Sequence, residues 1–178
     1  MILVLTGFMM CGKSSYGRAL AGRLGVPFMD LDDHIEEGVA ARDIIRSKGE
    51  EVFRAEETAA LERMLAREGD FILALGGGTP VREANRALLK AADCRVVWLK
   101  ASLEQSVFNP EWASLAAQRP LLDGGDRGRI TRLWESRIPA YNSVADHILT
   151  TDGKTPDQIL SELEVLAHLT RFPQVNSF

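Results

Sequence analysis

The stretch GFMMCGKS, residues 7–14, matches the pattern G-x-x-x-x-G-K-[ST] of a phosphate-binding loop, or P-loop. It follows an apolar run, Ile2–Thr6, that is typical of a strand buried on both faces, and it leads into a helical pattern over Lys13–Leu24. In that context the glycines let the backbone wrap around a phosphate, so that successive N–H groups and the helix N-terminus face the anion. A chance match in a glycine turn is the weaker alternative, because strand, motif and helix are in register.

The motif also supplies groups for a nucleotide and a metal ion. Lys13 is expected to neutralise β- and γ-phosphate oxygens, and Ser14 to offer Mg²⁺ a hydroxyl ligand. Cys11 is interpreted as a small loop residue and not as a nucleophile, because no histidine or second cysteine lies nearby in the sequence. The expected ATP-binding residues are Met10, Cys11, Gly12, Lys13, Ser14, Ser15 and, from a later segment, Arg119.

Short apolar runs alternate with helical patterns along the rest of the chain. The further expected strands are residues 26–29, 71–75, 95–99 and 147–149, and the further expected helices are residues 50–68, 82–91, 127–141 and 155–169. Such alternation indicates right-handed crossovers and a parallel sheet covered on both faces. The sequence therefore predicts a three-layer α/β fold.

The composition limits the class of protein. With 178 residues and 46% hydrophobic residues the chain fits one domain, expected over residues 1–170, followed by a fraying tail at residues 171–178. The net charge of −4 lacks the broad positive field of nucleic-acid-binding proteins. Two cysteines are too few for a disulfide framework, and no apolar run approaches the roughly 18 residues of a membrane span. We therefore expect a cytoplasmic protein without nucleic-acid or membrane partners.

Two acidic residues follow the second expected strand, at the sheet edge where such folds bind ligands. Alternation along an extended chain would place the carboxylates of Asp30 and Asp32 on the same side. One could then hold the water shell of the metal ion, and the other could orient or deprotonate the attacking hydroxyl. The alternative is an acidic N-cap for a helix that begins near Asp33.

Arginines and glycines on three later segments complete the candidate site. Arg54 and Glu57 have the spacing of a pair on one helix face, although a surface salt bridge has the same pattern. Residues 76–78 are all glycine, which favours a ligand close to the backbone, with a plain tight turn as the alternative. Arg137 precedes Pro139, where we expect the helix to break. Two arginines on separate elements suit bidentate recognition of a planar carboxylate.

A long segment, residues 109–128, interrupts the alternation with two prolines and a Gly-Gly pair. Its length and its Arg119 favour a mobile lid over a phosphate site, and a disordered insertion is the alternative.

Taken in order, these segments resemble the shikimate kinase family over nearly the whole chain. Besides the P-loop, the motifs that carry the resemblance are Asp30-x-Asp32, Gly49-Glu50 with Phe53-Arg54-x-x-Glu57, Leu75-Gly76-Gly77-Gly78, Arg119-Pro120-Leu121-Leu122 and Arg137-x-Pro139-x-Tyr141. The resemblance implies a nucleoside-monophosphate-kinase type of fold, with a five-stranded parallel sheet in the order 2-3-1-4-5. It also implies phosphoryl transfer from Mg-ATP to the 3-hydroxyl of shikimate, in aromatic amino-acid synthesis, by a protein that we expect to be a monomer.

Roles for the acceptor side come with the resemblance. A shikimate-binding segment at about residues 32–61 would include Asp32 at the reacting hydroxyl and Arg54 at the carboxylate. Arg137 would share the carboxylate. Gly77 and Gly78 would offer backbone contacts.

Roles on the phosphate side are implied in the same way. Arg119 would reach the phosphates from the lid, and the catalytic residues would be Lys13, Asp32 and Arg119. Mg²⁺ would be held by Ser14 and, through water, by Asp30.

The chain departs from the family pattern at several positions. Met10 and Cys11 stand where the family usually has glycine and a small residue, and Ala74 stands where a serine is common. The segment around residues 37–43 is shorter than usual. Residues 106–118 are longer than usual and contain no arginine near the expected adenine site.

Two aromatic residues in or beside that longer segment, Phe108 and Trp112, would either stack on the base or belong to the core.

Two other functions fit part of this pattern: a nucleotide-binding protein without turnover, and a related kinase acting on gluconate or a nucleotide. A decayed enzyme would have lost some of the charged residues, and all of them are present. The arginine pair together with Asp32 suits a polyol acid better than a neutral polyol or a base. The sequence therefore favours catalysis on shikimate.

Overall fold

The computed structural model describes residues 1–35, 41–110 and 126–171 of the chain. In this part of the chain five parallel strands form one sheet in the order β2-β3-β1-β4-β5, as expected from the sequence. The strands are β1 (Ile2–Thr6), β2 (Phe28–Asp30), β3 (Phe71–Ala74), β4 (Cys94–Lys100) and β5 (His147–Thr150).

Strand β1 lies in the middle of the sheet, and all of its side chains are buried. Ile2 and Val4 belong to the apolar core on one face, whereas Leu3 and Leu5 belong to the core on the other face. A strand that is buried on both faces needs apolar residues at every position, which explains the continuous apolar run at the start of the chain.

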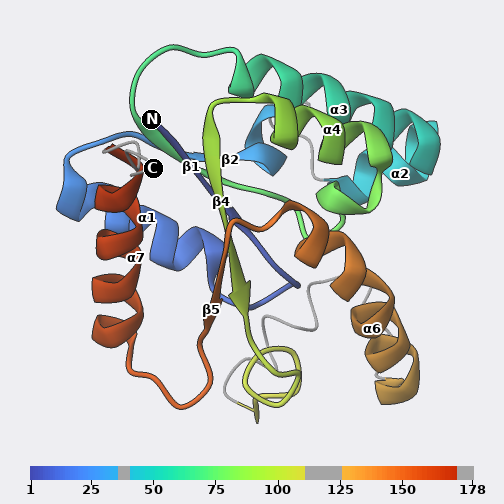
Figure 1. Ribbon diagram of the computed structural model, residues 1–178. Coiled ribbons are helices and arrows are strands. Elements are labelled where there is room, and N and C mark those ends of the chain that lie inside the picture. The colour runs from blue at the N-terminus through green and yellow to red at the C-terminus, as the bar shows by residue number, and fades with distance from the viewer. Residues whose placement is uncertain (36–40, 111–125, 172–178) are drawn as a thin grey trace.

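Helices cover both faces of the sheet (Figure 1). One face is covered by α1 (Lys13–Leu24) and α7 (Pro156–Arg171), which pack against each other. The other face is covered by α3 (Glu50–Leu65), α4 (Glu83–Ala91) and α6 (Arg127–Val144), with α2 (Ala41–Lys48) packed against α3. Among the described residues, no helix has the length and apolar character that crossing a membrane requires.

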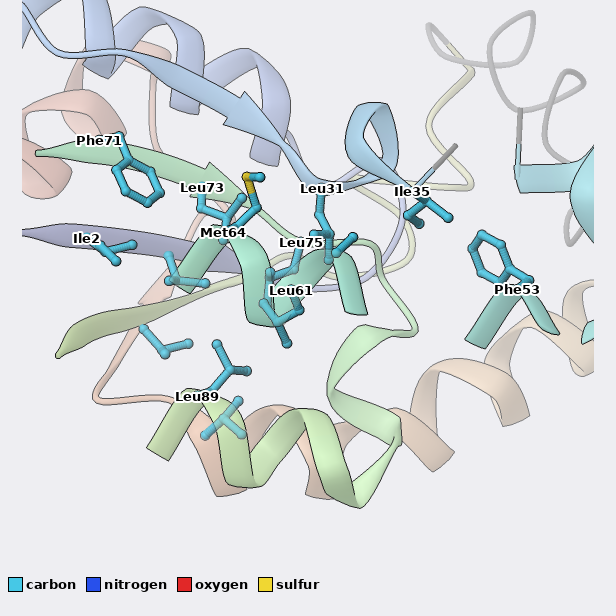
Figure 2. Packing of buried hydrophobic residues seen from close by; sticks show 14 of the residues in the cluster. Ile2, Leu31, Ile35, Phe53, Leu61, Met64, Phe71, Leu73, Leu75 and Leu89 are labelled. Atoms are coloured by element: carbon cyan, nitrogen blue, oxygen red, sulfur yellow. The ribbon is translucent and has the colours of Figure 1, made fainter. Parts of the chain in front are cut away.

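The core on the α3 and α4 face is shown in Figure 2. Leu61 and Met64 of α3 and Leu89 of α4 belong to the same buried cluster as Phe71 and Leu73 of β3, with Leu89 at its α4 end. This packing fixes the position of β3, whose carboxyl end leads into the three glycines of the candidate site.

The second strand begins later than expected, at Phe28 instead of residue 26. Helix α1 ends at Gly25, which has a φ of 66°, and the N–H group of Val26 donates to the carbonyl of Ala21. This helix cap uses the N–H group of Val26, so the strand begins after it. Helix α2 was not expected from the sequence, since its eight residues contain only two large apolar side chains, Ile44 and Ile45.

The expected helix break at Pro139 is wrong, because α6 continues to Val144. A proline inside a helix removes one hydrogen bond. Tyr141 and Val144, which follow the proline, are buried at helical spacing from Arg137, and their packing holds the last turn of α6 in place.

The docking of α7 gives a test of the layered packing. Leu163 is fully buried against the sheet, whereas Val165, two residues away on the same helix, is 59% exposed. Leu163→Ala is expected to lower the free energy of unfolding by about 2 to 5 kcal/mol. Val165→Ala is the matched control and is expected to change it by less than about 0.5 kcal/mol. Urea unfolding of both variants measures the difference, and equal effects would contradict this packing.

Candidate functional site

The P-loop joins β1 to α1 and encloses the ammonium group of Lys13. Nζ of Lys13 donates to the carbonyl oxygens of Gly7 at 3.0 Å and Phe8 at 2.9 Å. A Cβ atom on Gly7 would lie 2.5 Å from the carbonyl oxygen of Leu99 in β4, so a side chain has no room there. Gly12 has a φ of 92° and caps α1, which begins at Lys13.

Two residues of the loop take the positions where the family pattern has smaller ones. Met10 has a φ of 63°, a left-handed conformation that is costly for a residue with a side chain. Its half-buried side chain packs against an apolar cluster that includes Trp98 and Ile130. Cys11 is buried in the α1 and α7 core, as its interpretation as a small loop residue implies.

Asp30 connects the P-loop helix to the turn after β2. The hydroxyl of Ser14 donates to Oδ2 of Asp30 at 2.6 Å, and Oδ1 of Asp30 accepts from the N–H group of Asp32 at 3.3 Å. Asp30 is therefore the N-cap of a 3₁₀ helix, Leu31–His34. The alternative of an acidic N-cap is confirmed. The cap is Asp30, and the helix begins at Leu31 and not near Asp33.

The strand alternation assumed for Asp30 and Asp32 is wrong. The chain leaves the extended conformation at Leu31, so the two side chains serve different parts of the site. Asp30 contacts Ser14, whereas a Cβ atom on Gly76 would lie 2.9 Å from Oδ1 of Asp32.

The other two glycines of the loop face arginines. A Cβ atom on Gly77 would lie 3.5 Å from Nη1 of Arg137, and one on Gly78 would lie 2.9 Å from Nη1 of Arg54. The Gly76–Gly78 loop thus brings together one carboxylate and two guanidinium groups from three separate elements. The tight-turn alternative also holds, because the N–H group of Thr79 donates to the carbonyl of Gly76 at 3.1 Å.

Arg54 is oriented by a buried carboxylate. Its Nη1 donates to Oε2 of Glu57 at 3.0 Å, and the Glu57 side chain is only 1% exposed. Oε1 of Glu57 accepts from the hydroxyl of Thr79 at 2.8 Å. The alternative of a plain surface salt bridge is therefore wrong, because one partner is fully buried and has a second hydrogen bond.

Arg137 is positioned by Phe8 of the P-loop and lies one turn before Tyr141 on α6. The residue is 7% exposed, and the centre of its guanidinium group lies 5.4 Å from the ring centroid of Phe8. One turn later, the hydroxyl of Tyr141 donates to the carbonyl of Gly77 at 2.6 Å. Burial raises the pKa of the Tyr141 phenol far above its ordinary value, against the opposing effect of Arg137, so the hydroxyl remains a donor.

Two further predicted residues flank the site. Ser15 lies exposed in the first turn of α1. Phe108 is half-buried against the same cluster as Met10, with the guanidinium of Arg127 3.7 Å from its ring centroid, which supports the core alternative for this ring.

The central part of the expected lid lies outside the described residues. Arg119 and Trp112 are among the residues concerned. The helix after this segment, α6, begins at Arg127 as expected and is capped by Asp126, whose side chain accepts from the N–H group of Arg129.

Sequence reasoning assigned no function to Thr79 or Tyr141. The spacing could have indicated Tyr141, because it follows Arg137 by four residues and so lies on the same helix face. For Thr79 the one such feature in the sequence is its position directly after the three glycines.

Comparison with known proteins places the chain in a family. The family model described as shikimate kinase matches residues 9–167. The chain belongs to the shikimate kinase family. A shikimate kinase from Dictyoglomus turgidum is 37% identical over 163 residues, which cover 90% of this chain and 94% of that protein. A shikimate kinase from Pseudomonas syringae pv. syringae is 39% identical over 174 residues, covering 96% and 97%.

The fold agrees with a solved member of the shikimate kinase family. The structure of the shikimate kinase from Acinetobacter baumannii in complex with shikimate superimposes with a TM-score of 0.84 at 29% identity, covering 97% of this chain and 95% of that one. The resemblance inferred from the sequence motifs is thereby confirmed.

The bond from Tyr141 to the glycine loop is expected to stabilise the folded protein. Tyr141→Phe removes the donor to the carbonyl of Gly77 and is expected to lower the free energy of unfolding by about 1 kcal/mol or more. Tyr16→Phe, which removes a half-buried phenol hydroxyl on α1, is the matched control. Chemical denaturation measures both, and a Tyr141→Phe variant as stable as the parent would contradict the importance of this bond.

Proposed function

We propose that this chain transfers the γ-phosphoryl group of Mg-ATP to the 3-hydroxyl of shikimate, giving shikimate 3-phosphate and ADP for aromatic amino-acid biosynthesis. The observation that supports this most strongly is the position of Gly77. A Cβ atom there would lie 3.4 Å from both the carbonyl oxygen of Gly7 and the N atom of Met9, and 3.5 Å from Arg137. The loop that gathers the acceptor-side charges therefore lies directly against the P-loop.

On the nucleotide side, the P-loop offers fixed positive charge and backbone donors. Lys13 is held at the loop by two carbonyls, so its charge is already placed where β- and γ-phosphate oxygens would bind. Phosphoryl transfer needs little covalent chemistry from the protein, and positioned charge supplies most of the acceleration.

The metal ion fits the oxygen atoms at the start of α1. Ser14 and Asp30 provide a hydroxyl and a carboxylate in direct contact, and hard oxygen ligands of this kind are those that Mg²⁺ prefers. We assign Ser14 as a ligand and Asp30 as a partner through water. When bound, the ion would neutralise charge on the phosphate oxygens.

On the acceptor side, Asp32 is the group for the reacting hydroxyl. Its carboxylate is exposed and lies against Gly76, at the edge of the sheet where β1 and β3 end. In the proposed reaction Asp32 accepts a hydrogen bond from the 3-hydroxyl and takes its proton as the new O–P bond forms. The bond between the γ-phosphorus and the bridging oxygen breaks, and ADP leaves with that electron pair.

Arg54 and Arg137 are the groups for the acceptor's carboxylate. A guanidinium group is planar and presents a rigid fork of donors, which suits a planar carboxylate better than an ammonium group does. The roles of Arg119 and of a closing lid remain predictions, as do a monomeric state and a cytoplasmic location.

Turnover with a panel of acceptors tests the proposed reaction. With Mg-ATP present, ADP release is expected with shikimate and to be much weaker with quinate and gluconate, and removal of Mg²⁺ by chelation is expected to abolish it. A coupled assay for ADP measures all of these. Equal turnover with gluconate would favour the related-kinase alternative, and no turnover with any of the three would favour a binding protein.

The P-loop assignment is checked in the same assay. Lys13→Ala is expected to reduce kcat/KM by at least about 100-fold, because the charge acts chiefly on the transferring group. Its circular dichroism spectrum is expected to match that of the parent. A folded Lys13→Ala variant with near-parental turnover would exclude the role proposed for this residue.

The arginine pair predicts a selective loss of acceptor binding. Arg54→Lys and Arg137→Lys keep the positive charge and lose the forked donors of the guanidinium group. Each variant is expected to raise the KM for shikimate by about tenfold or more. A tenfold rise corresponds to the loss of one charge-assisted hydrogen bond of about 1.5 kcal/mol. The KM for ATP is expected to change little. Arg23→Lys, on the exposed face of α1, is the control. Unchanged shikimate KM in both variants would show that the arginines have a structural role.

A further inference from the structure

A buried chain of hydrogen bonds connects helix α4 to the arginine of the acceptor side. The side-chain amide of Asn85 donates to the carbonyl of Thr79 at 2.9 Å, and the hydroxyl of Thr79 donates to Oε1 of Glu57 at 2.8 Å. The other oxygen of Glu57 accepts from Nη1 of Arg54 at 3.0 Å. Asn85, Thr79 and Glu57 are each at most 1% exposed.

The hydroxyl of Thr79 determines how the Glu57 carboxylate is turned. A buried carboxylate with one partner is free to rotate about its last torsion, whose rotamers are broad. With Thr79 on Oε1 and Arg54 on Oε2, both oxygens are occupied, and the plane of the group is fixed. The guanidinium that donates to this carboxylate is then held in one orientation against Gly78.

The burial of the Asn85 side chain in the core is destabilising. Its Oδ1 atom is buried and finds no hydrogen-bond partner among the described residues, and an unpaired buried acceptor is destabilising. An apolar residue of similar size would avoid this cost at a position that is 0% exposed. The benefit that offsets it is the bond from the same amide to the Thr79 carbonyl, which holds the short 3₁₀ helix Thr79–Val81 in place.

We propose that Thr79 and Asn85 are positioning residues for acceptor binding, which act through Glu57 to hold the Arg54 guanidinium in the orientation that receives the substrate carboxylate. The inference rests on the proposed function, in which Arg54 binds that carboxylate. It extends the site to two residues that contact neither substrate. From the Arg54 side chain the described bonds continue only to the exposed carboxylate of Glu50, at 3.5 Å, and do not reach Lys13 or Ser14, so the expected effect is confined to the acceptor.

Substitution at residue 79 tests the proposal. Thr79→Val keeps the shape of the side chain and removes the hydroxyl, and it is expected to raise the KM for shikimate about two- to tenfold while the KM for ATP stays within about twofold. Thr79→Ser retains a hydroxyl, so its KM for shikimate is expected to stay close to that of the parent. Asn85→Leu is expected to shift the shikimate KM in the same direction as Thr79→Val.

The control is Thr58→Val, on the same helix as Glu57. The Thr58 hydroxyl donates to the backbone carbonyl of Arg54 at 2.9 Å, so this variant loses a comparable bond without touching the Glu57 carboxylate. Its shikimate KM is expected to match that of the parent. If Thr79→Val does not fold, Thr79→Ala against Thr79→Ser gives the same comparison, with shikimate binding measured by calorimetry on the folded protein.

A double-mutant cycle distinguishes positioning from a merely structural role. If Thr79 acts through Arg54, the combination of Thr79→Val with Arg54→Lys raises the shikimate KM by less than the product of the two single effects. An unchanged shikimate KM in folded Thr79→Val, an equal rise in the KM for ATP, or fully multiplicative effects would each overturn the proposal. Absence of shikimate turnover in the parent protein would instead reject the proposed function itself.

Discussion

The absence of side chains at Gly76–Gly78 is the constraint on which the candidate site depends. The described backbone places none of these three glycines at positive φ, and Gly78 has a φ of −100° that any residue adopts. Space is the reason for glycine at positions 76 and 78, where a Cβ atom would lie 2.9 Å from the side chains of Asp32 and Arg54, whereas at Gly77 a Cβ atom would make ordinary contacts with the P-loop backbone and Arg137. A side chain at Gly76 or Gly78 would displace the carboxylate of Asp32 or the guanidinium of Arg54.

The buried charge of Glu57 restricts how the surrounding elements pack. Glu57 is almost fully buried, and a buried carboxylate is tolerated only when it is paired and hydrogen-bonded. Arg54 and Thr79 meet that demand, so α3 and the turn after β3 have to stay in register with each other. The apolar core of Figure 2, beneath α3 and α4, supplies the rigidity that this register requires.

The sequence predicted those parts of the site whose chemistry is local. The P-loop, the strand order implied by the family motifs, and the pairing of Arg54 with Glu57 each depend on spacing within a few residues or on an ordered set of motifs. The predictions that are wrong took the backbone conformation from the local sequence alone. The strand alternation assumed for Asp30 and Asp32 does not extend past Leu31, where a 3₁₀ helix begins, and tertiary packing carries α6 through Pro139.

The bonds from Thr79 and Tyr141 could not be predicted in the same way. They join residues 22 and 64 positions apart, so they appear only when the elements are packed together.

The position of Lys13 has an electrostatic consequence for the P-loop. The carbonyl oxygens of Gly7 and Phe8 both point at its Nζ, and each carries the negative end of a peptide dipole. Without the ammonium group, those two dipoles would face an incoming polyphosphate and repel it. Lysine therefore screens the loop's own backbone as well as attracting the ligand. Its third contact is to Sγ of Cys11 at 3.9 Å, a weak acceptor that a phosphate oxygen can replace. A neutral side chain at this position would remove this screening together with the attraction, and only the backbone N–H groups and the helix N-terminus would remain to hold the phosphates.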